Sequence, residues 1–232
     1  MIFILTGSGI SAESGIRTYR SDTGLWEEHA IAEVATLDGF RRDQDAVRAF
    51  YDARLEDCLK AEPNAAHLAL ARLERESDLP VVIVTQNVDD LHERAGSTNV
   101  IHMHGSLGTS LCAWCGKRAA GDFPHRLLEA PKCASCGSGM RPNIVWFGET
   151  PMHLEKIQEH LRAATLFLSI GTSGEVHPAA RFVRWAKKPK SNKARCIEVN
   201  LRRTEISNDF REERRGPATQ VVPKLVDELL AG

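Results

Sequence analysis

The chain opens with IFILTGSGIS at residues 2–11, an apolar run that leads directly into a glycine-rich turn. Consecutive apolar residues bounded by glycine are typical of a strand buried on both faces of a parallel sheet. The spacing Gly7-x-Gly9-x-x-Ala12 is typical of a loop that binds a dinucleotide pyrophosphate on backbone amides and a helix N-terminus. We therefore expect a buried strand at 2–5, then a turn into a helix. The acidic strand end about 20 positions later that dehydrogenases carry is missing.

Strands and helices alternate along the rest of the chain. Apolar runs predict further strands at 79–85, 99–102, 165–170 and 196–200, and helical periodicity predicts helices at 45–60, 64–76, 90–95 and 220–230. This alternation predicts an α/β fold whose parallel sheet is covered by helices on both faces. Polar residues follow each predicted strand, and ligands of such sheets bind at the carboxyl ends of the strands.

Four cysteines form the most specific local motif of the chain. Cys112 and Cys115 make one CxxC pair, and Cys133 and Cys136 make the second after seventeen residues. Two such pairs are typical of a tetrahedral Zn²⁺ held by four thiolates, and four protein ligands leave no open position for catalysis. Iron in the same site, or free or disulfide-bonded thiols, are the alternatives. The surrounding segment, 109–142, lacks periodicity, so we expect an inserted structural module.

Composition and charge exclude several classes of protein. The chain has 232 residues and a net charge of −1, from 30 Lys+Arg against 31 Asp+Glu, so it lacks the basic excess of a nucleic-acid binder. No apolar run approaches the roughly 18 residues of a membrane span. The apolar run starts right after Met1, which leaves no room for a signal peptide. We expect a monomeric cytoplasmic enzyme, with the two remaining cysteines, Cys58 and Cys196, buried in regular elements and residues 187–193 forming a solvated loop.

Two further polar clusters follow neighbouring predicted strands. The first is TQNVDDLH at 85–92, and the second is IHMHG at 101–105. They bring amides, carboxylates and histidines to one sheet edge, where a histidine is suited to act as a general base near neutral pH. A loop of capping and turn residues is the structural alternative.

Together these motifs resemble the sirtuins, the NAD-dependent protein lysine deacylases. The matching segments, in order, are GSGIS, GIRTYRSDTGLW, TQNVDDLHERAG, HMHG, the four cysteines, VWFGE at 145–149, GTSGEVHPA at 171–179 and EVN at 198–200. The resemblance covers essentially the whole chain and is closest to the bacterial class III enzymes. It implies transfer of succinyl, malonyl or acetyl groups from lysine side chains of proteins to the ADP-ribose part of NAD, with release of nicotinamide.

The resemblance also implies a division of the chain. The expected fold is a Rossmann-like sheet with helices on both faces, plus a small domain made of a zinc module and a helical insertion. The NAD-binding domain would be discontinuous, over 1–28, 63–108 and 143–232. The helical insertion would span 29–62, and the zinc module 109–142.

The resemblance also implies roles for individual residues of this chain. His104 matches the catalytic histidine, Asn87 would hold the ribose and a water, and Asp89 would bind the nicotinamide carboxamide. The residues that match NAD contacts are Gly7, Ser8, Gly9, Tyr19, Arg20, Gln86, Asn87, Val88, Asp89, Gly171, Thr172, Ser173, Asn200 and Ala218. Where Ser8, Tyr19 and His177 stand, the family usually has alanine, phenylalanine and tyrosine.

The substrate side centres on the helix predicted at 45–60. Tyr51 and Arg54 are three apart and share the face of its apolar stripe, where a guanidinium needs an anion. They match the Tyr-x-x-Arg of enzymes that take acidic acyl groups, and Ala35 matches the small residue that widens the acyl pocket. An ion pair from Arg54 to Asp57 is the structural alternative. The residues expected to hold the peptide as an added strand are Val145, Phe147, Gly148, Glu175 and Val176.

Two other functions stay open at this point. A sirtuin-like mono-ADP-ribosyltransferase or NAD glycohydrolase would share the NAD pocket without removing acyl groups. A non-catalytic, zinc-bearing module that senses NAD would share it without any turnover.

Overall fold

A six-stranded parallel sheet forms the centre of the fold. The computed structural model describes residues 1–17, 25–26, 29–119, 129, 131–187 and 194–232. The strand order is β10-β9-β8-β1-β4-β5, and every neighbouring pair is parallel. The strands are β1 (Ile2–Thr6), β4 (Val81–Thr85), β5 (Val100–His102), β8 (Leu166–Ile170), β9 (Arg195–Asn200) and β10 (Glu212–Arg215).

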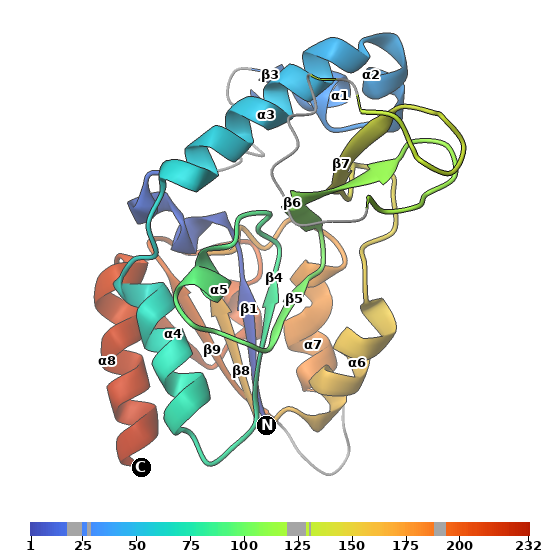
Figure 1. Cartoon of the computed structure of the whole chain (residues 1–232). Helices are drawn as coiled ribbons and strands as arrows, with labels where there is room; N and C mark the ends of the chain where they lie inside the picture. Colours follow the sequence, from blue (N-terminus) through green and yellow to red (C-terminus); the bar gives the residue numbers. More distant parts are fainter. Residues whose placement is uncertain (18–24, 27–28, 120–128, 130, 188–193) are drawn as a thin grey trace.

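Helices cover both faces of this sheet, as the alternation predicts (Figure 1). On one face lie α4 (Ala65–Glu76) and α8 (Ala218–Ala231), and on the other α6 (Leu154–Ala163) and α7 (Phe182–Ala186). The central strand β1 sends Ile2 and Ile4 into the first layer and Phe3 and Leu5 into the second. This alternation leaves β1 buried on both sides and explains why its sequence is continuously apolar.

A second group of elements lies across the carboxyl end of the sheet (Figure 1). Its helices are α1 (Ile31–Val34), α2 (Leu37–Arg42) and α3 (Gln44–Lys60), and its strands are β2 (Leu25–Trp26), β3 (His29–Ala30), β6 (Gly105–Cys112) and β7 (Met140–Ile144). The helices share one apolar cluster with Leu107 of β6 and Ile144 of β7. The proposed domain boundaries stay a prediction. This cluster joins the expected helical insertion, 29–62, to Leu107 and Ile144, which the division assigns to the NAD-binding domain.

The prediction of a helix directly after the first glycine loop is wrong. Two 3₁₀ turns, η1 (Ser8–Ile10) and η2 (Ala12–Ser14), stand in its place. Gly15 ends the second turn with φ 89°, a left-handed conformation that stops a helix. The segment therefore has no long helix N-terminus to offer a phosphate, and most backbone amides between Gly7 and Ile16 already donate to carbonyls of the protein.

Several elements lie where no helix or strand was predicted. They include α6, α7 and β10, and the 3₁₀ turns η4 (Ala179–Arg181) and η5 (Ser207–Asp209). The predicted short helix is α5 (Leu91–Arg94), which is followed by Gly96 at φ 102°. Cys58 and Cys196 are buried as predicted, and most of the loop at 187–193 lies outside the described residues. Within the described residues, none of the helices has the length and apolarity to cross a membrane.

Candidate functional site

A cavity of about 510 Å³ lies where the carboxyl ends of β1, β4 and β8 face α3. It brings together residues from both groups of elements, as expected for a ligand site at the carboxyl edge of a parallel sheet. The predicted residues that line it are Gly7, Ser8, Ala35, Tyr51, Arg54, Gln86, Asn87, Val88, Asp89, His104, Val145, Phe147, Gly148, Gly171, Thr172, Ser173, Glu175 and Val176.

Two backbone segments meet closely at one end of the cavity. The amide of Gly9 donates to the carbonyl of Gly171 at 2.9 Å, and a Cβ on Gly9 would lie 2.7 Å from the Gly171 Cα. Gly7 has the same restriction, because its Cβ would lie 2.8 Å from the Gly171 oxygen. Glycine at these positions therefore lets the loops after β1 and β8 pack together, which a larger residue would prevent.

A buried polar cluster lies beside these loops. Ser11 Oγ donates to Asp89 Oδ2 at 3.1 Å and accepts from Asn87 Nδ2 at 3.0 Å. The Leu91 amide donates to the other Asp89 oxygen at 3.2 Å. Burial raises the pKa of Asp89, while these hydrogen bonds oppose the shift. The cluster holds an amide and a carboxyl group at fixed positions on the cavity wall, which suits recognition of a polar ligand group.

His104 has the geometry of a general base. Its Nδ1 lies 3.2 Å from the carbonyl oxygen of Gln86, and a carbonyl only accepts, so Nδ1 carries the hydrogen. Burial lowers the pKa of His104, which keeps the ring neutral near pH 7 and leaves Nε2 able to take a proton. By contrast, His102 pairs with Glu93 at 2.7 Å and contacts the carbonyl of Asn87. The two histidines thus have different surroundings, with His104 on the cavity wall.

The other end of the cavity is formed by α3. Tyr51 and Arg54 line it together with Ala35, and both side chains are almost fully buried. Arg54 Nη1 lies 3.8 Å from Asp57 Oδ2, so the ion pair considered as the structural alternative exists. It is long, and Asp57 is 45% exposed, so this pair compensates little of the cost of burying the guanidinium. Burial accordingly lowers the pKa of Arg54.

The segment at 145–148 forms one rim of the cavity. The amide of Val145 donates to the carbonyl of His104, and that of Phe147 donates to the carbonyl of Ala35, each at 2.9 Å. These bonds tie the segment to both the histidine and the acyl-side residues. Phe147 is 52% exposed beside the cavity, so an apolar side chain stands at its entrance.

Some predicted residues lie away from the cavity wall. Gly9 packs against the backbone of Gly171 in the loop after β8. Asn200 donates through Nδ2 to the carbonyl of Thr172 at 2.7 Å. Ala218 is buried at the start of α8. Tyr19 and Arg20 lie outside the described residues. Several residues that line the cavity had no predicted role, namely Ser11, Ile16, Arg17, Cys58, Ile144, Trp146, Glu149 and Pro151. His177, where the family usually has tyrosine, lines the cavity as well.

Most of these missed residues stand inside the motifs quoted above, and Ser11 and Trp146 show why their roles were missed. Ser11 belongs to GSGIS and Trp146 to VWFGE, so their positions were signalled but their contacts were not. A serine in a turn and a tryptophan after a strand are usually explained by capping and packing. Only the long-range hydrogen bonds to Asp89 and Tyr51 give them another role.

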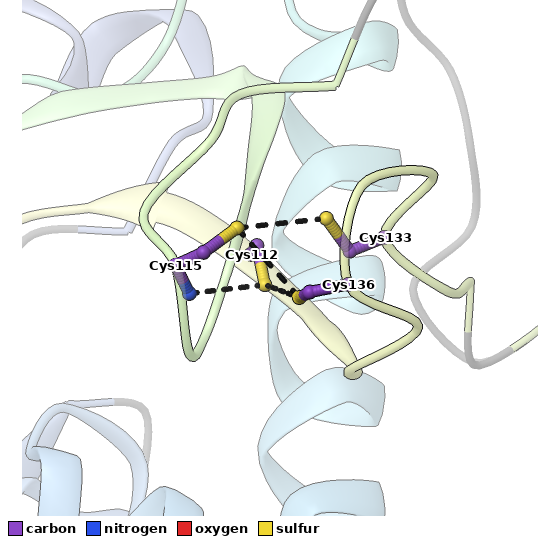
Figure 2. A group of neighbouring side chains, drawn as sticks. All are labelled: Cys112, Cys115, Cys133 and Cys136. Atoms are coloured by element: carbon purple, nitrogen blue, oxygen red, sulfur yellow. Dashed lines mark hydrogen bonds between the residues drawn. The ribbon is translucent and has the colours of Figure 1, made fainter.

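The four cysteines meet in a separate site between two tight turns (Figure 2). Their sulfur atoms lie within 4.8 Å of one another, and the pairs closest together are 3.4–3.7 Å apart. A tetrahedral Zn²⁺ with Zn–S bonds of about 2.3 Å places its sulfurs about 3.8 Å apart. A disulfide needs about 2.05 Å.

The backbone of both turns suits thiolate ligands. Gly116 and Gly137 have φ of 69° and 73°, and their amides close the turns onto Cys112 and Cys133. The amides of Trp114, Cys115 and Ser135 point at cysteine sulfurs at 3.4 Å. Donors aimed at sulfur favour the charged form, so the residues present fit a structural Zn²⁺ bound by Cys112, Cys115, Cys133 and Cys136.

Comparison with known proteins identifies the family. The model of the Sir2 family matches residues 7–178. The chain belongs to the Sir2 family. It is 51% identical over 240 residues to a Vibrio vulnificus protein named NAD-dependent protein deacylase, covering 99% of this chain and 94% of that protein. An Escherichia coli K12 protein of the same name is 48% identical over 235 residues, covering 100% of this chain and 82% of the relative.

Solved Sir2 structures share the fold as well. The complex of a Sir2 homologue with NAD superposes with a TM-score of 0.89 at 39% identity, covering 98% of this chain and 88% of the other. The expected sirtuin resemblance and the α/β fold are thereby confirmed. The Sir2 match spans the glycine loop, His104 and the four cysteines.

Proposed function

We propose that this Sir2 protein is an NAD-dependent deacylase that acts on acylated lysine side chains of proteins. The observation that carries the proposal is that His104 shares one cavity with the glycine loops at one end and Arg54 at the other. The relatives named NAD-dependent protein deacylase and the NAD complex of a Sir2 homologue support it.

In this proposal each part of the cavity has a task. The loops after β1 and β8, which place Ser8, Thr172 and Ser173 on the cavity wall, bind the phosphates of NAD. Asn87 and Asp89 orient the ribose and the nicotinamide carboxamide. His104 takes a proton from a ribose hydroxyl at Nε2, because Nδ1 is engaged by the Gln86 carbonyl. Val145, Phe147, Gly148, Glu175 and Val176 hold the substrate peptide between them.

The zinc site has a structural part in the same proposal. A Zn²⁺ with four protein thiolates has no position left for substrate, so its contribution is to hold the two turns together. We place the enzyme in the cytoplasm, where reduced thiols are available to the metal. We expect it to be a monomer.

The reaction products test the activity. Incubation with NAD and a succinylated peptide should yield nicotinamide, free lysine peptide and 2′-O-acyl-ADP-ribose. His104→Ala should lower the rate by about 100-fold or more, as for loss of a general base. His160→Ala, on α6 and away from the cavity wall, is the matched control. Free ADP-ribose or ADP-ribosylated protein without the acyl product would point to the glycohydrolase or transferase, and an absence of any turnover to the NAD-sensing module.

We further propose that the acyl pocket prefers succinyl and malonyl groups over acetyl. Arg54 is a buried guanidinium on the cavity wall, and a terminal carboxylate would pair with it bidentately. Tyr51 stands one turn earlier on the same face, and Ala35 leaves room for the longer acyl chain.

Arg54→Met tests this preference. Loss of a carboxylate contact of about 1.5–3 kcal/mol should lower kcat/KM for succinyl peptides by about 10-fold or more, while deacetylation survives. Arg48→Met is the control, since Arg48 is a buried arginine on the same helix that pairs with Asp45 and Gln44. An equal loss of both activities in Arg54→Met would assign Arg54 a structural role only.

A further inference from the structure

The indole of Trp146 contacts the acyl end of the cavity through a single directed hydrogen bond. Its Nε1 lies 2.9 Å from Tyr51 Oη, and both side chains are 1% exposed. An indole N–H can only donate, so the Tyr51 oxygen is the acceptor of this bond. The Tyr51 hydroxyl hydrogen is therefore turned away from the indole. Burial also raises the pKa of Tyr51, which keeps that hydrogen in place at neutral pH.

The indole ring is held on its face by Arg141. The guanidinium of Arg141 lies 4.0 Å from the centre of the Trp146 ring, a close cation–π contact. Arg141 Nη2 also pairs with Glu149 Oε1 at 2.6 Å. The second oxygen of Glu149 accepts from the Trp146 amide at 2.9 Å, and the Glu149 amide donates to the Trp146 carbonyl at 3.0 Å. One arginine and one glutamate therefore fix both the ring and the backbone of Trp146.

Arg141, which holds the indole of Trp146, lies on β7, the strand that packs against the cysteine site. Arg141 is the second residue of β7, and its neighbour Met140 pairs with Cys112 across the two-stranded sheet. Met140 also packs in one apolar cluster with Cys112 and Cys133. The contacts thus run without a gap from the cysteine turns through β7 to Trp146 and Tyr51.

We propose that Trp146 is a positioning residue that determines acyl specificity, by directing the Tyr51 hydroxyl hydrogen toward the far end of the acyl group, with Arg141 holding the indole in place. The inference rests on the proposed preference for acidic acyl groups. A hydroxyl donor so directed strengthens binding of a terminal carboxylate and gives nothing to the methyl of an acetyl group. Trp146 should consequently act on KM for succinyl and malonyl peptides and leave the acetyl reaction alone.

Replacement of the indole by phenyl isolates the hydrogen bond. Trp146→Phe keeps an aromatic ring under Arg141 and removes the N–H. We expect KM for a succinyl peptide to rise by about 5-fold or more, the size expected for the loss of one neutral hydrogen bond, with kcat and the acetyl reaction changed by less than about 2-fold. Trp185→Phe, on α7 and half-buried against Phe182, is the matched control and should leave both substrates unchanged.

A double-variant cycle with Tyr51→Phe decides whether Trp146 acts through Tyr51. If it does, the effect of Trp146→Phe on the succinyl KM should vanish in the Tyr51→Phe background. Additive effects, or equal losses for acetyl and succinyl peptides, would overturn the proposal and leave Trp146 a packing residue. The Arg54→Met result distinguishes failure of this inference from failure of the proposed acyl preference. If Arg54→Met loses succinyl preference while Trp146→Phe keeps it, this inference fails and the acyl preference stands; if neither variant changes the preference, the acyl preference itself fails.

Discussion

The two ends of the cavity are held by different kinds of contact. At the nucleotide end, loops after β1 and β8 touch backbone to backbone, and the glycines allow that approach. At the acyl end, long side chains from α3 and β7 meet, and a guanidinium, an indole and a phenol position one another. The first end depends on the register of β1 against β8, which brings the backbone of Gly9 beside that of Gly171. The second depends on packing between segments about 90 residues apart, such as Tyr51 and Trp146.

Because of this difference, substitutions at the two ends should affect activity in different ways. A change at the nucleotide end alters a surface that every substrate uses, so all acyl groups should suffer alike. A change at the acyl end alters side chains that only one part of the substrate contacts, so its effect should depend on the acyl group.

The largest effect is expected from a methyl group at the nucleotide end. In Gly9→Ala the new Cβ would lie 2.7 Å from the Gly171 Cα, and backbone cannot move aside as a flexible side chain would. We expect kcat/KM to fall by about 100-fold or more for acetyl and succinyl peptides alike, since misplacing bound substrate by about 1 Å has effects of this size. Calorimetric titration with NAD should show the loss of affinity, and a thermal melt reports whether the fold survives. A fall in kcat/KM for one acyl group alone would contradict the expectation that all substrates depend equally on the nucleotide end.

Removal of the metal should affect the acyl end more than the nucleotide end. The cysteine turns support β7, and β7 carries Arg141, whereas the glycine loops belong to the sheet. Treatment with a strong chelator should raise KM for a succinyl peptide by about 10-fold, the lower range seen when a supporting shell of a site is disturbed. The Kd for NAD should change much less, and re-addition of Zn²⁺ should restore KM. Equal weakening of both ligands would show that the module supports the whole cavity.

Two buried histidines below the nucleotide end make stability depend on pH. His67 and His92 are fully buried with ring centres 5.0 Å apart, and burial lowers their pKa values to about 4 and about 3. The unfolded chain takes up protons near the ordinary value of about 6.5, before the folded chain does. The free energy of unfolding should therefore fall as pH drops below about 6.5, by up to about 1.4 kcal/mol per pH unit for each histidine, until the folded-state pKa values are reached.

His67→Gln provides the check on this dependence. Denaturant unfolding between pH 7 and pH 4 should show a shallower fall in the free energy of unfolding for His67→Gln than for the parent chain. His29→Gln serves as the control, since His29 is exposed on β3. An unchanged slope in His67→Gln would mean that His67 does not titrate between the two states in this range.

The smallest effect is expected from Ser8. This residue lines the cavity in the glycine loop, and its Cβ is already accommodated there. Ser8→Ala removes only the hydroxyl, so KM for NAD should change by less than about 3-fold, within the range of one neutral hydrogen bond. Steady-state kinetics at saturating peptide measure it, and a change as large as that in Gly9→Ala would show that the serine oxygen itself binds NAD.

Most of the fold could be predicted from local pattern. The strands at Ile2–Thr6, Val81–Thr85 and Leu166–Ile170 are continuous apolar runs, because a parallel strand under two helical layers has no exposed face. The helix Gln44–Lys60 follows its stripe closely. The helix after the first loop was predicted wrongly, since periodicity does not reveal that Gly15 adopts a left-handed conformation after one turn.

The site was predictable to the extent that it lies in short motifs. The glycine loop and the cysteine pairs each place their chemistry within a few residues and were selected by spacing, whereas His104 was selected by the resemblance to the sirtuins. Ser11 and Trp146 stand in the same motifs, but their partners, Asp89 and Tyr51, lie 78 and 95 residues away. A hydrogen bond of that separation has no local signature.

The sequence by itself predicted the α/β architecture, four cysteines as candidate metal ligands and, through the sirtuin resemblance, His104 as the candidate base. Each of these has a local signal in the sequence: a continuous apolar run, two CxxC pairs, and a short motif that contains the histidine. Only the tertiary structure decided the tautomer of His104, set by the Gln86 carbonyl, and the direction of the Tyr51 hydroxyl, set by Trp146. The physical reason is that a hydrogen bond orders its donor and acceptor only when packing brings the two groups within about 3 Å. The sheet brings the strand ends together at such distances, and the acyl end depends in addition on contacts between elements that the sheet alone does not align.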